Sequence, residues 1–122
     1  MEKLPWTIAV VEDDPSMLKS VQRLLNVHGY TTQAYSSAED YLDRPVTKID
    51  CLVLDVDLGG MSGIELQRQL RDAGSKLPVI FMTALEDDAL EAEAARTGCI
   101  AYLRKPFAAT SLIDAIDKAL AA

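Results

Sequence analysis

Four short apolar runs of this 122-residue chain each end at a polar side chain, and this pattern constrains the fold more than any other feature. The runs are residues 8–11, 51–54, 79–82 and 100–103. Segments with helical spacing separate them, so strands and helices alternate along the chain. Such alternation predicts a parallel sheet covered by helices on both faces. A more polar, alternating segment, residues 30–35, adds a further strand at an edge of the sheet.

The helical segments carry residues that are typical of helix ends. Asp14-Pro15 can begin the first helix, and Gly29 can end it in a left-handed conformation. Ser37 predicts the start of a short helix that runs to about Asp43. The later helices are expected to end at Gly74, to cover residues 88–96 and to cover residues 110–120. The α/β class therefore follows, as a doubly wound, flavodoxin-like five-stranded parallel sheet with strand order 2-1-3-4-5.

Length and charge narrow the kind of protein further. The size suits one domain, residues 1–122, and 49% hydrophobic with 25% charged residues is ordinary for a soluble globular protein. The net charge is −7 and no basic stripe is present, so we expect this domain to make no contact with nucleic acid. No segment reaches the roughly 18 apolar residues of a membrane span. Cys51 and Cys99 lack metal-ligand spacing and indicate buried thiols in a reducing cytoplasm.

The segment Ala89–Arg96 stands apart from the other helices. It contains a single large apolar residue, Leu90, among alanines and charged residues. A helix of this kind buries little area, so we expect it to be among the least firmly held elements. An alanine-rich surface helix and a movable element are both compatible with the sequence.

The carboxyl ends of parallel strands share one edge of a sheet, where ligands of open α/β sheets bind. That edge would gather Glu12 and Asp13 after the first strand, Asp55 after the third, Thr83 after the fourth and Lys105 after the fifth. Neighbouring carboxylates repel unless a cation lies between them. Mg²⁺ suits a site of one or two carboxylates completed by water and phosphate oxygens. The set therefore indicates a divalent metal and a phosphoryl group.

Individual residues of the set allow more than one role. Asp55 could serve as metal ligand, base or nucleophile toward phosphorus. Asp57 could offer its backbone carbonyl to the metal while its side chain points into solvent. Lys105 supplies a compact positive charge, and its bond to Pro106 could be cis or trans. His28, the single histidine, follows a helix away from the expected site and indicates a structural role.

Taken together, these residues resemble the receiver domain of bacterial two-component response regulators. The resemblance covers nearly the whole chain, and the segments Val10–Ser16 and Lys105–Phe107 are close to family signatures. The sequence between the motifs is most similar to receivers attached to helix-turn-helix transcription regulators. It leaves open whether an output domain follows Ala122 or the receiver stands alone.

The resemblance implies a role for each residue of the site. Asp55 would accept a phosphoryl group from a histidine kinase or phosphotransfer protein, as a phosphoacceptor rather than an enzyme. Asp13, Asp55 and the Asp57 carbonyl would hold Mg²⁺ with support from Glu12. Lys105 and Thr83 would contact the phosphoryl oxygens.

The resemblance also implies how the signal leaves the site. Thr83 and the aromatic Tyr102 would switch a surface made by the fourth helix, the fifth strand and the fifth helix, with Ile100 as a further participant. That surface would serve dimerisation or partner docking, and so control transcription or another output. Gly63 matches a family glycine. Glu12 replaces a more frequent aspartate, and Leu58-Gly59 replaces Met-Pro, which predicts a more mobile loop.

Two alternatives share some of these features. A haloacid-dehalogenase-like phosphatase would use Asp55 as nucleophile and Asp57 as general acid, but it places this strand first, whereas two strands precede it here. A flavodoxin-like electron carrier shares the fold but needs a neutral loop for the flavin phosphate. The acidic run Glu12–Asp14 would repel that phosphate.

Overall fold

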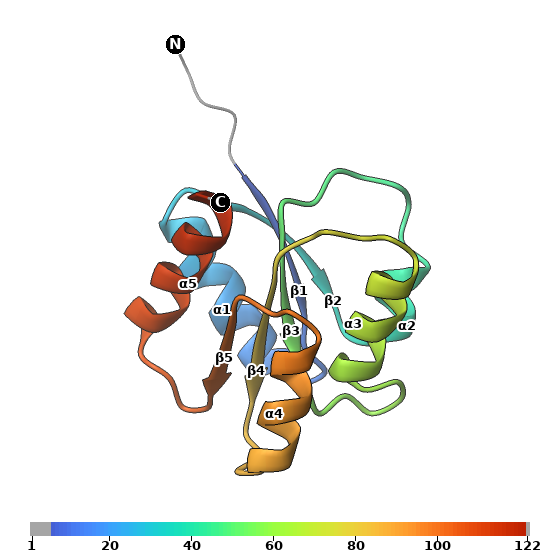
Figure 1. Cartoon of the computed structure of the whole chain (residues 1–122). Coiled ribbons are helices and arrows are strands. Elements are labelled where there is room, and N and C mark those ends of the chain that lie inside the picture. Colours follow the sequence, from blue (N-terminus) through green and yellow to red (C-terminus); the bar gives the residue numbers. More distant parts are fainter. Residues whose placement is uncertain (1–5, 122) are drawn as a thin grey trace.

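The computed structural model describes residues 6–121, in which five strands alternate with five helices (Figure 1). The strands are β1 (Thr7–Val11), β2 (Thr31–Tyr35), β3 (Cys51–Asp55), β4 (Val79–Thr83) and β5 (Ala101–Arg104). The helices are α1 (Pro15–Val27), α2 (Ala38–Leu42), α3 (Gly63–Asp72), α4 (Asp88–Arg96) and α5 (Ala109–Ala121). Within this range no helix is both long and apolar enough to cross a bilayer.

The strands form one sheet in the order β2-β1-β3-β4-β5, and every neighbouring pair is parallel. The predicted fold and strand order are therefore confirmed. Strands β3 and β4 are buried along their whole length, as expected for central strands with helices on both faces. The edge strands β2 and β5 are only partly buried, and the polar sequence of β2 matches its edge position.

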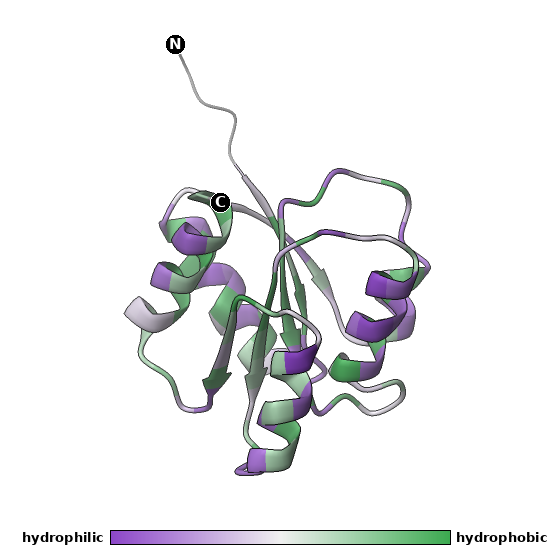
Figure 2. Ribbon diagram, in the orientation of Figure 1, coloured by the Kyte–Doolittle hydropathy of each residue, from purple (hydrophilic) through white to green (hydrophobic). Residues whose placement is uncertain are grey.

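Each face of the sheet has its own apolar core. One core joins the sheet to α2, α3 and α4, and the other joins it to α1 and α5. The strands are the most hydrophobic part of the ribbon, while polar residues mark the outer sides of the helices (Figure 2). Along each central strand, alternate side chains point into opposite cores, as the two-residue period of a strand requires. The two cores hold the strands in place, and the strand ends fix the backbone positions of the polar residues at the carboxyl edge.

The helix ends follow the sequence closely. Asp14 caps α1 by accepting a hydrogen bond from the Ser16 backbone N–H at 3.0 Å, with Pro15 in the first turn. Asp87 accepts from two backbone N–H groups and caps α4. Ser62 caps α3. Gly29 has a φ of 90°, the left-handed conformation predicted for it.

The structure corrects a few details. Strand β2 begins at Thr31 rather than Tyr30, because the Tyr30 N–H donates to Leu25 and still belongs to the end of α1. Strand β5 lies one residue later than predicted, and α5 is one residue longer at each end. Cys51 is buried as expected, but Cys99 is only half-buried because it lies in the turn before β5. The bond between Lys105 and Pro106 is cis.

Candidate functional site

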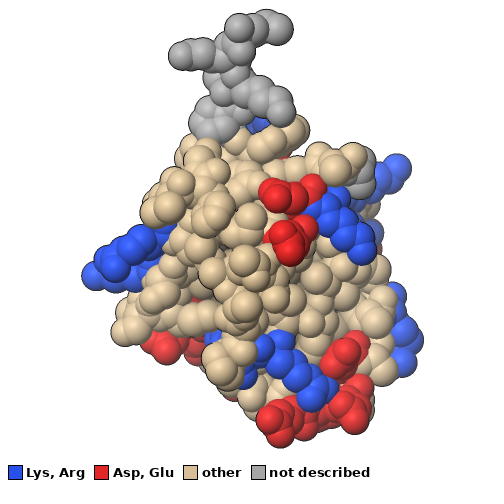
Figure 3. Space-filling view, turned by 90° about the vertical axis from the view of Figure 1, so that its left-hand side faces the viewer, with Lys and Arg blue, Asp and Glu red and all other residues tan. Residues whose placement is uncertain are grey.

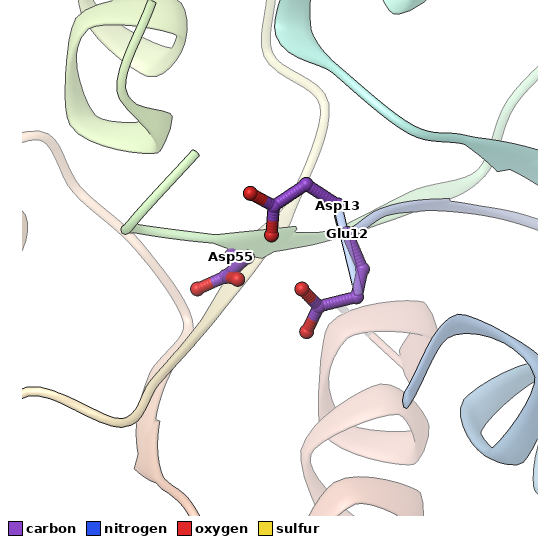
Figure 4. A group of neighbouring side chains, drawn as sticks. All are labelled: Glu12, Asp13 and Asp55. Atoms are coloured by element: carbon purple, nitrogen blue, oxygen red, sulfur yellow. The ribbon is translucent and has the colours of Figure 1, made fainter. Parts of the chain in front are cut away.

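Three carboxylates meet where β1 and β3 end. Glu12 and Asp13 directly follow β1, and Asp55 is the last residue of β3 (Figure 4). Each residue offers a carboxylate oxygen, and these oxygens all lie within 4.8 Å of one another. Residues 12 and 55 are far apart in the chain, and they meet because β1 and β3 are parallel neighbours in the sheet. We call Glu12, Asp13 and Asp55 the acidic cluster.

Two members of the acidic cluster are removed from water. Glu12 is 1% exposed and Asp55 is 3% exposed, whereas Asp13 is exposed. The Asp14 backbone N–H donates to Glu12 Oε2 at 3.2 Å, and the Asp57 N–H donates to Asp55 Oδ1 at 3.2 Å. These hydrogen bonds orient the two buried carboxylates from their own loops. The cluster therefore combines a buried floor with one solvent-facing acid.

Lys105 completes the charge arrangement from the segment after β5. Its ammonium donates to Glu12 Oε1 at 2.5 Å and to Asp55 Oδ2 at 3.3 Å. Burial favours the neutral amine, but the two carboxylates outweigh it, so the pKa of Lys105 is raised above its ordinary value. Lys105 therefore remains charged and bridges the two buried acids.

A single ammonium does not balance the cluster. Burial, and then the nearby Glu12, raise the pKa of Asp55 to about 7. Burial and Glu12 also raise the pKa of Asp13. In both cases the protein disfavours a full set of charged carboxylates. An all-oxygen donor set with excess negative charge, partly open to water, fits a hard divalent cation such as Mg²⁺.

Thr83 ends β4 beside this edge and is fully buried. Its hydroxyl oxygen accepts a hydrogen bond from the Leu85 N–H at 3.0 Å, and its carbonyl accepts one from the Lys105 N–H at 2.7 Å. The second bond links the end of β4 to the residue that carries the ammonium. Thr83 is therefore connected both to the β4–α4 loop and to the Lys105 backbone.

Tyr102 lies in β5, outside the acidic cluster. Its ring packs near Phe81 of β4, with ring centroids 6.4 Å apart. Its hydroxyl is buried without a hydrogen-bond partner among the described residues.

The loop after Asp55 lies against the cluster. The Asp57 side chain is exposed, as predicted. At Gly63 an added Cβ would overlap the Asp55 carbonyl oxygen, so only glycine lets α3 begin this close to β3. The glycine singled out by the sequence thus has a direct steric reason.

The expected cluster is therefore present, and His28 lies apart from it, exposed and bonded to the Leu24 carbonyl. Two contacts were not predicted. Arg104 of β5 forms ion pairs with Asp88 and Glu91 of α4, and Glu39 of α2 binds the Met61 N–H. Both involve ordinary charged surface residues whose partners depend on loop conformation, so the sequence carries no signal for them.

Comparison with known proteins agrees with this geometry. The profile of the response regulator receiver domain matches residues 8–117. The chain belongs to the response regulator receiver domain family. Receiver domains of this kind are phosphoacceptors rather than enzymes, and a match over this range gives the haloacid-dehalogenase-like alternative no support.

The curated relatives that the chain matches include transcriptional regulators. The transcriptional regulatory protein TdiR of Thauera aromatica is 38% identical over 116 residues, which is 94% of this chain and 51% of TdiR. The chain thus spans about half the length of this curated relative. A crystal structure titled FixJ-N is 32% identical with a TM-score of 0.89, covering 98% of this chain and 96% of that one. The BeF3-activated DrrB receiver domain is 30% identical with a TM-score of 0.88, covering 98% of this chain and all of that one.

Proposed function

We propose that Asp55 is the phosphoacceptor of this receiver domain. The observation that carries the proposal is the meeting of three carboxylates within 4.8 Å, two of them bridged by Lys105, at the carboxyl edge of the sheet. In the transfer step an Asp55 oxygen bonds to phosphorus while the bond from phosphorus to a nitrogen of the donor's phosphohistidine breaks. Burial of Asp55 on a rigid strand end holds that oxygen in place for the reaction.

The same acids would hold Mg²⁺. The ligands we propose are the carboxylates of Asp13 and Asp55, with Glu12 in support, and the backbone carbonyl of Asp57. When bound, the ion neutralises the negative charge that builds up on the transferred phosphoryl group. The exposed side of Asp13 leaves the cluster open to solvent, from which a cation and a phosphodonor can enter.

Lys105 and Thr83 would receive the phosphoryl oxygens. The Lys105 ammonium already points at Asp55, and a phosphoryl group adds strong acceptor oxygens and nearly two negative charges at that place. The Thr83 hydroxyl accepts from Leu85, so its own hydrogen is free to donate toward a new acceptor. Movement of Thr83 would then change the space around Tyr102 and the surface formed by α4, β5 and α5, by a shift between existing conformations.

The partners follow from this activity. We propose a histidine kinase or phosphotransfer protein as donor, and the α4–β5–α5 surface as the face that docks a partner or a second receiver after phosphorylation. Similarity to TdiR, a transcriptional regulatory protein, supports transcription as the controlled output. Two cysteines without a disulfide suit a reducing compartment, so we place the domain in the cytoplasm.

Phosphorylation by a small donor tests the proposal. Acetyl phosphate with Mg²⁺ should add one phosphoryl group to the protein, seen by mass spectrometry and lost after hydroxylamine treatment. Asp55→Asn should abolish the modification while the circular dichroism spectrum stays unchanged, because the amide is similar in size but cannot form the acyl phosphate. Asp72→Asn, at an exposed aspartate that ends α3, is the matched control and should still be modified. Modification of the Asp55→Asn protein to the wild-type level would contradict the proposal.

A further inference from the structure

The loop between Asp55 and Ser62 forms one wall of the acidic cluster. An added Cβ at Gly59 would lie 3.9 Å from Asp13 Oδ2, so the loop backbone passes near this carboxylate. Asp57, whose carbonyl is a proposed metal ligand, belongs to the same loop. The position of this loop therefore sets the shape of the cation site.

The two ends of the loop are held by the sheet and by α3. The Val56 N–H donates to Met82 of β4 at 3.0 Å, and the Gly63 N–H donates back to the Val56 carbonyl at 3.0 Å. Between these points the backbone N–H groups of Leu58, Gly59 and Gly60 donate to no partner within residues 6–121. The middle of the loop is thus left without a bond from the sheet.

Glu39 of α2 binds the loop at Met61, its last residue before Ser62. It lies in the first turn of α2, and its Oε2 accepts a hydrogen bond from the Met61 N–H at 3.0 Å, across 22 residues of sequence. This bond, the largest of several effects, lowers the pKa of Glu39, which keeps the carboxylate charged at neutral pH. A charged acceptor binds a backbone N–H more strongly than a neutral one.

Gly60 makes room for this carboxylate. An added Cβ at Gly60 would lie 2.7 Å from Glu39 Oε2, closer than carbon and oxygen can approach, and 3.1 Å from Oε1, a tight contact. The backbone of Gly60 does not have a positive φ, so alanine is compatible with its conformation. A methyl group at this position would therefore displace the Glu39 carboxylate rather than strain the loop itself.

We infer that Glu39 is a positioning residue that fixes the β3–α3 loop against the acidic cluster and so tunes the binding of a divalent cation there. The inference rests on the proposed function, because it assumes that the cluster binds the cation. Glu39 touches neither the acidic cluster nor Lys105 among the contacts of the described residues, and it acts through Met61 and the loop backbone. Groups that orient metal ligands without touching the metal themselves commonly affect affinity in this way.

Removal of the carboxylate tests this role. Glu39→Ala should speed hydrogen exchange of the Met61 amide roughly tenfold in the metal-free protein, because its acceptor is lost. It should also weaken Mg²⁺ binding, measured by NMR titration, by about threefold to tenfold, at or below the effect typical of such outer partners. Glu39→Gln keeps an acceptor oxygen and should restore most of both properties. Asp43→Ala, which removes the same charge just after α2, should change neither.

Gly60→Ala supplies a second, steric test. It should reproduce both effects of Glu39→Ala, and the double variant should be no worse than either single one, since both break the same contact. If wild-type protein and Glu39→Ala bind Mg²⁺ with the same affinity, the inference is wrong but the proposed function stands. Unchanged hydrogen exchange of the Met61 amide in Glu39→Ala would have the same meaning. Wild-type protein that neither binds Mg²⁺ nor becomes phosphorylated would overturn the proposed function, and the inference with it.

Discussion

Helices α4 and α5 flank strand β5 from opposite faces of the sheet, and they are held by different forces. Helix α5 has 13 residues and buries Leu112, Ala115, Ile116 and Ala119 in the core that it shares with α1. Helix α4 has nine residues and buries only Ala94, with Leu90 half-buried. The apolar area of α5 fixes it to the sheet, whereas α4 has little such area to lose when it moves.

Ion pairs replace apolar burial on the α4 side. Arg104 of β5 donates to Asp88 at 2.8 Å and to Glu91 at 2.9 Å, and Asp88 and Glu91 both lie on α4. All three side chains are substantially exposed, so water and salt weaken these pairs. Charged side chains crowd the lower end of the face drawn in Figure 3, beneath a broad area of uncharged residues. The side with weak, reversible contacts is the side proposed to carry the signal.

The largest expected effect is on α5. Ile116→Ala removes a fully buried side chain from the α1–α5 core and should lower the free energy of unfolding by about 2–5 kcal/mol. Urea denaturation followed by circular dichroism measures the change. A loss well below 1 kcal/mol would mean that apolar burial does not hold α5 firmly to the sheet, and α5 would then not differ from α4 in this respect.

The matching truncation on α4 should cost less. Leu90→Ala removes a half-buried side chain and should lower the free energy of unfolding by about 1 kcal/mol, roughly half of a fully buried leucine. In this variant, amide hydrogen exchange should become faster in α4 than in α5, because α4 would open locally without unfolding of the whole domain. Equal losses from Leu90→Ala and Ile116→Ala would erase the difference between the two helices.

The smallest effect is expected from Arg104→Ala. Loss of the exposed ion pairs should leave the urea midpoint nearly unchanged but speed exchange of α4 amides at low salt. At 1 M NaCl the variant and the wild-type protein should converge, since screening already weakens the pairs. Lys19→Ala on α1 is the control, as Lys19 forms no ion pair within residues 6–121. A salt-independent difference at α4 would show that Arg104 acts through packing of its side chain instead.

Features fixed by the sheet and by apolar burial could be predicted from the sequence, whereas contacts between exposed side chains could not. The carboxyl ends of parallel strands lie at the same edge of the sheet. The sequence positions of four residues therefore predicted that they meet there: Glu12, Asp13, Asp55 and Lys105. The small buried surface of α4 could also be predicted, because its residues offer few apolar side chains. The contacts made by Arg104 could not be predicted, because they depend on where exposed side chains meet across a loop.

The Glu39 contact shows the same limit at the site itself. A glutamate in the first turn of a helix is ordinary, and nothing near Glu39 in the sequence points to Met61. Leu58-Gly59 in place of Met-Pro predicted a more mobile loop, yet the next residue, Gly60, is where the Glu39 carboxylate fits against it. The composition of the loop predicts a mobile backbone, whereas the hydrogen bond from Met61 to Glu39 is a tertiary contact that restrains it.

The most direct test of the account is an NMR comparison of the protein with and without beryllofluoride and Mg²⁺. Beryllofluoride bound to Asp55 would stand in for the phosphoryl group, and the backbone signals of residues 83–104, which include α4 and β5, should then shift far more than those of α1. Asp55→Asn should remove the response. Large shifts spread equally over α1 and α4, or an unchanged spectrum in the wild-type protein, would contradict the claim that a phosphoacceptor at this edge drives one weakly held side of the sheet.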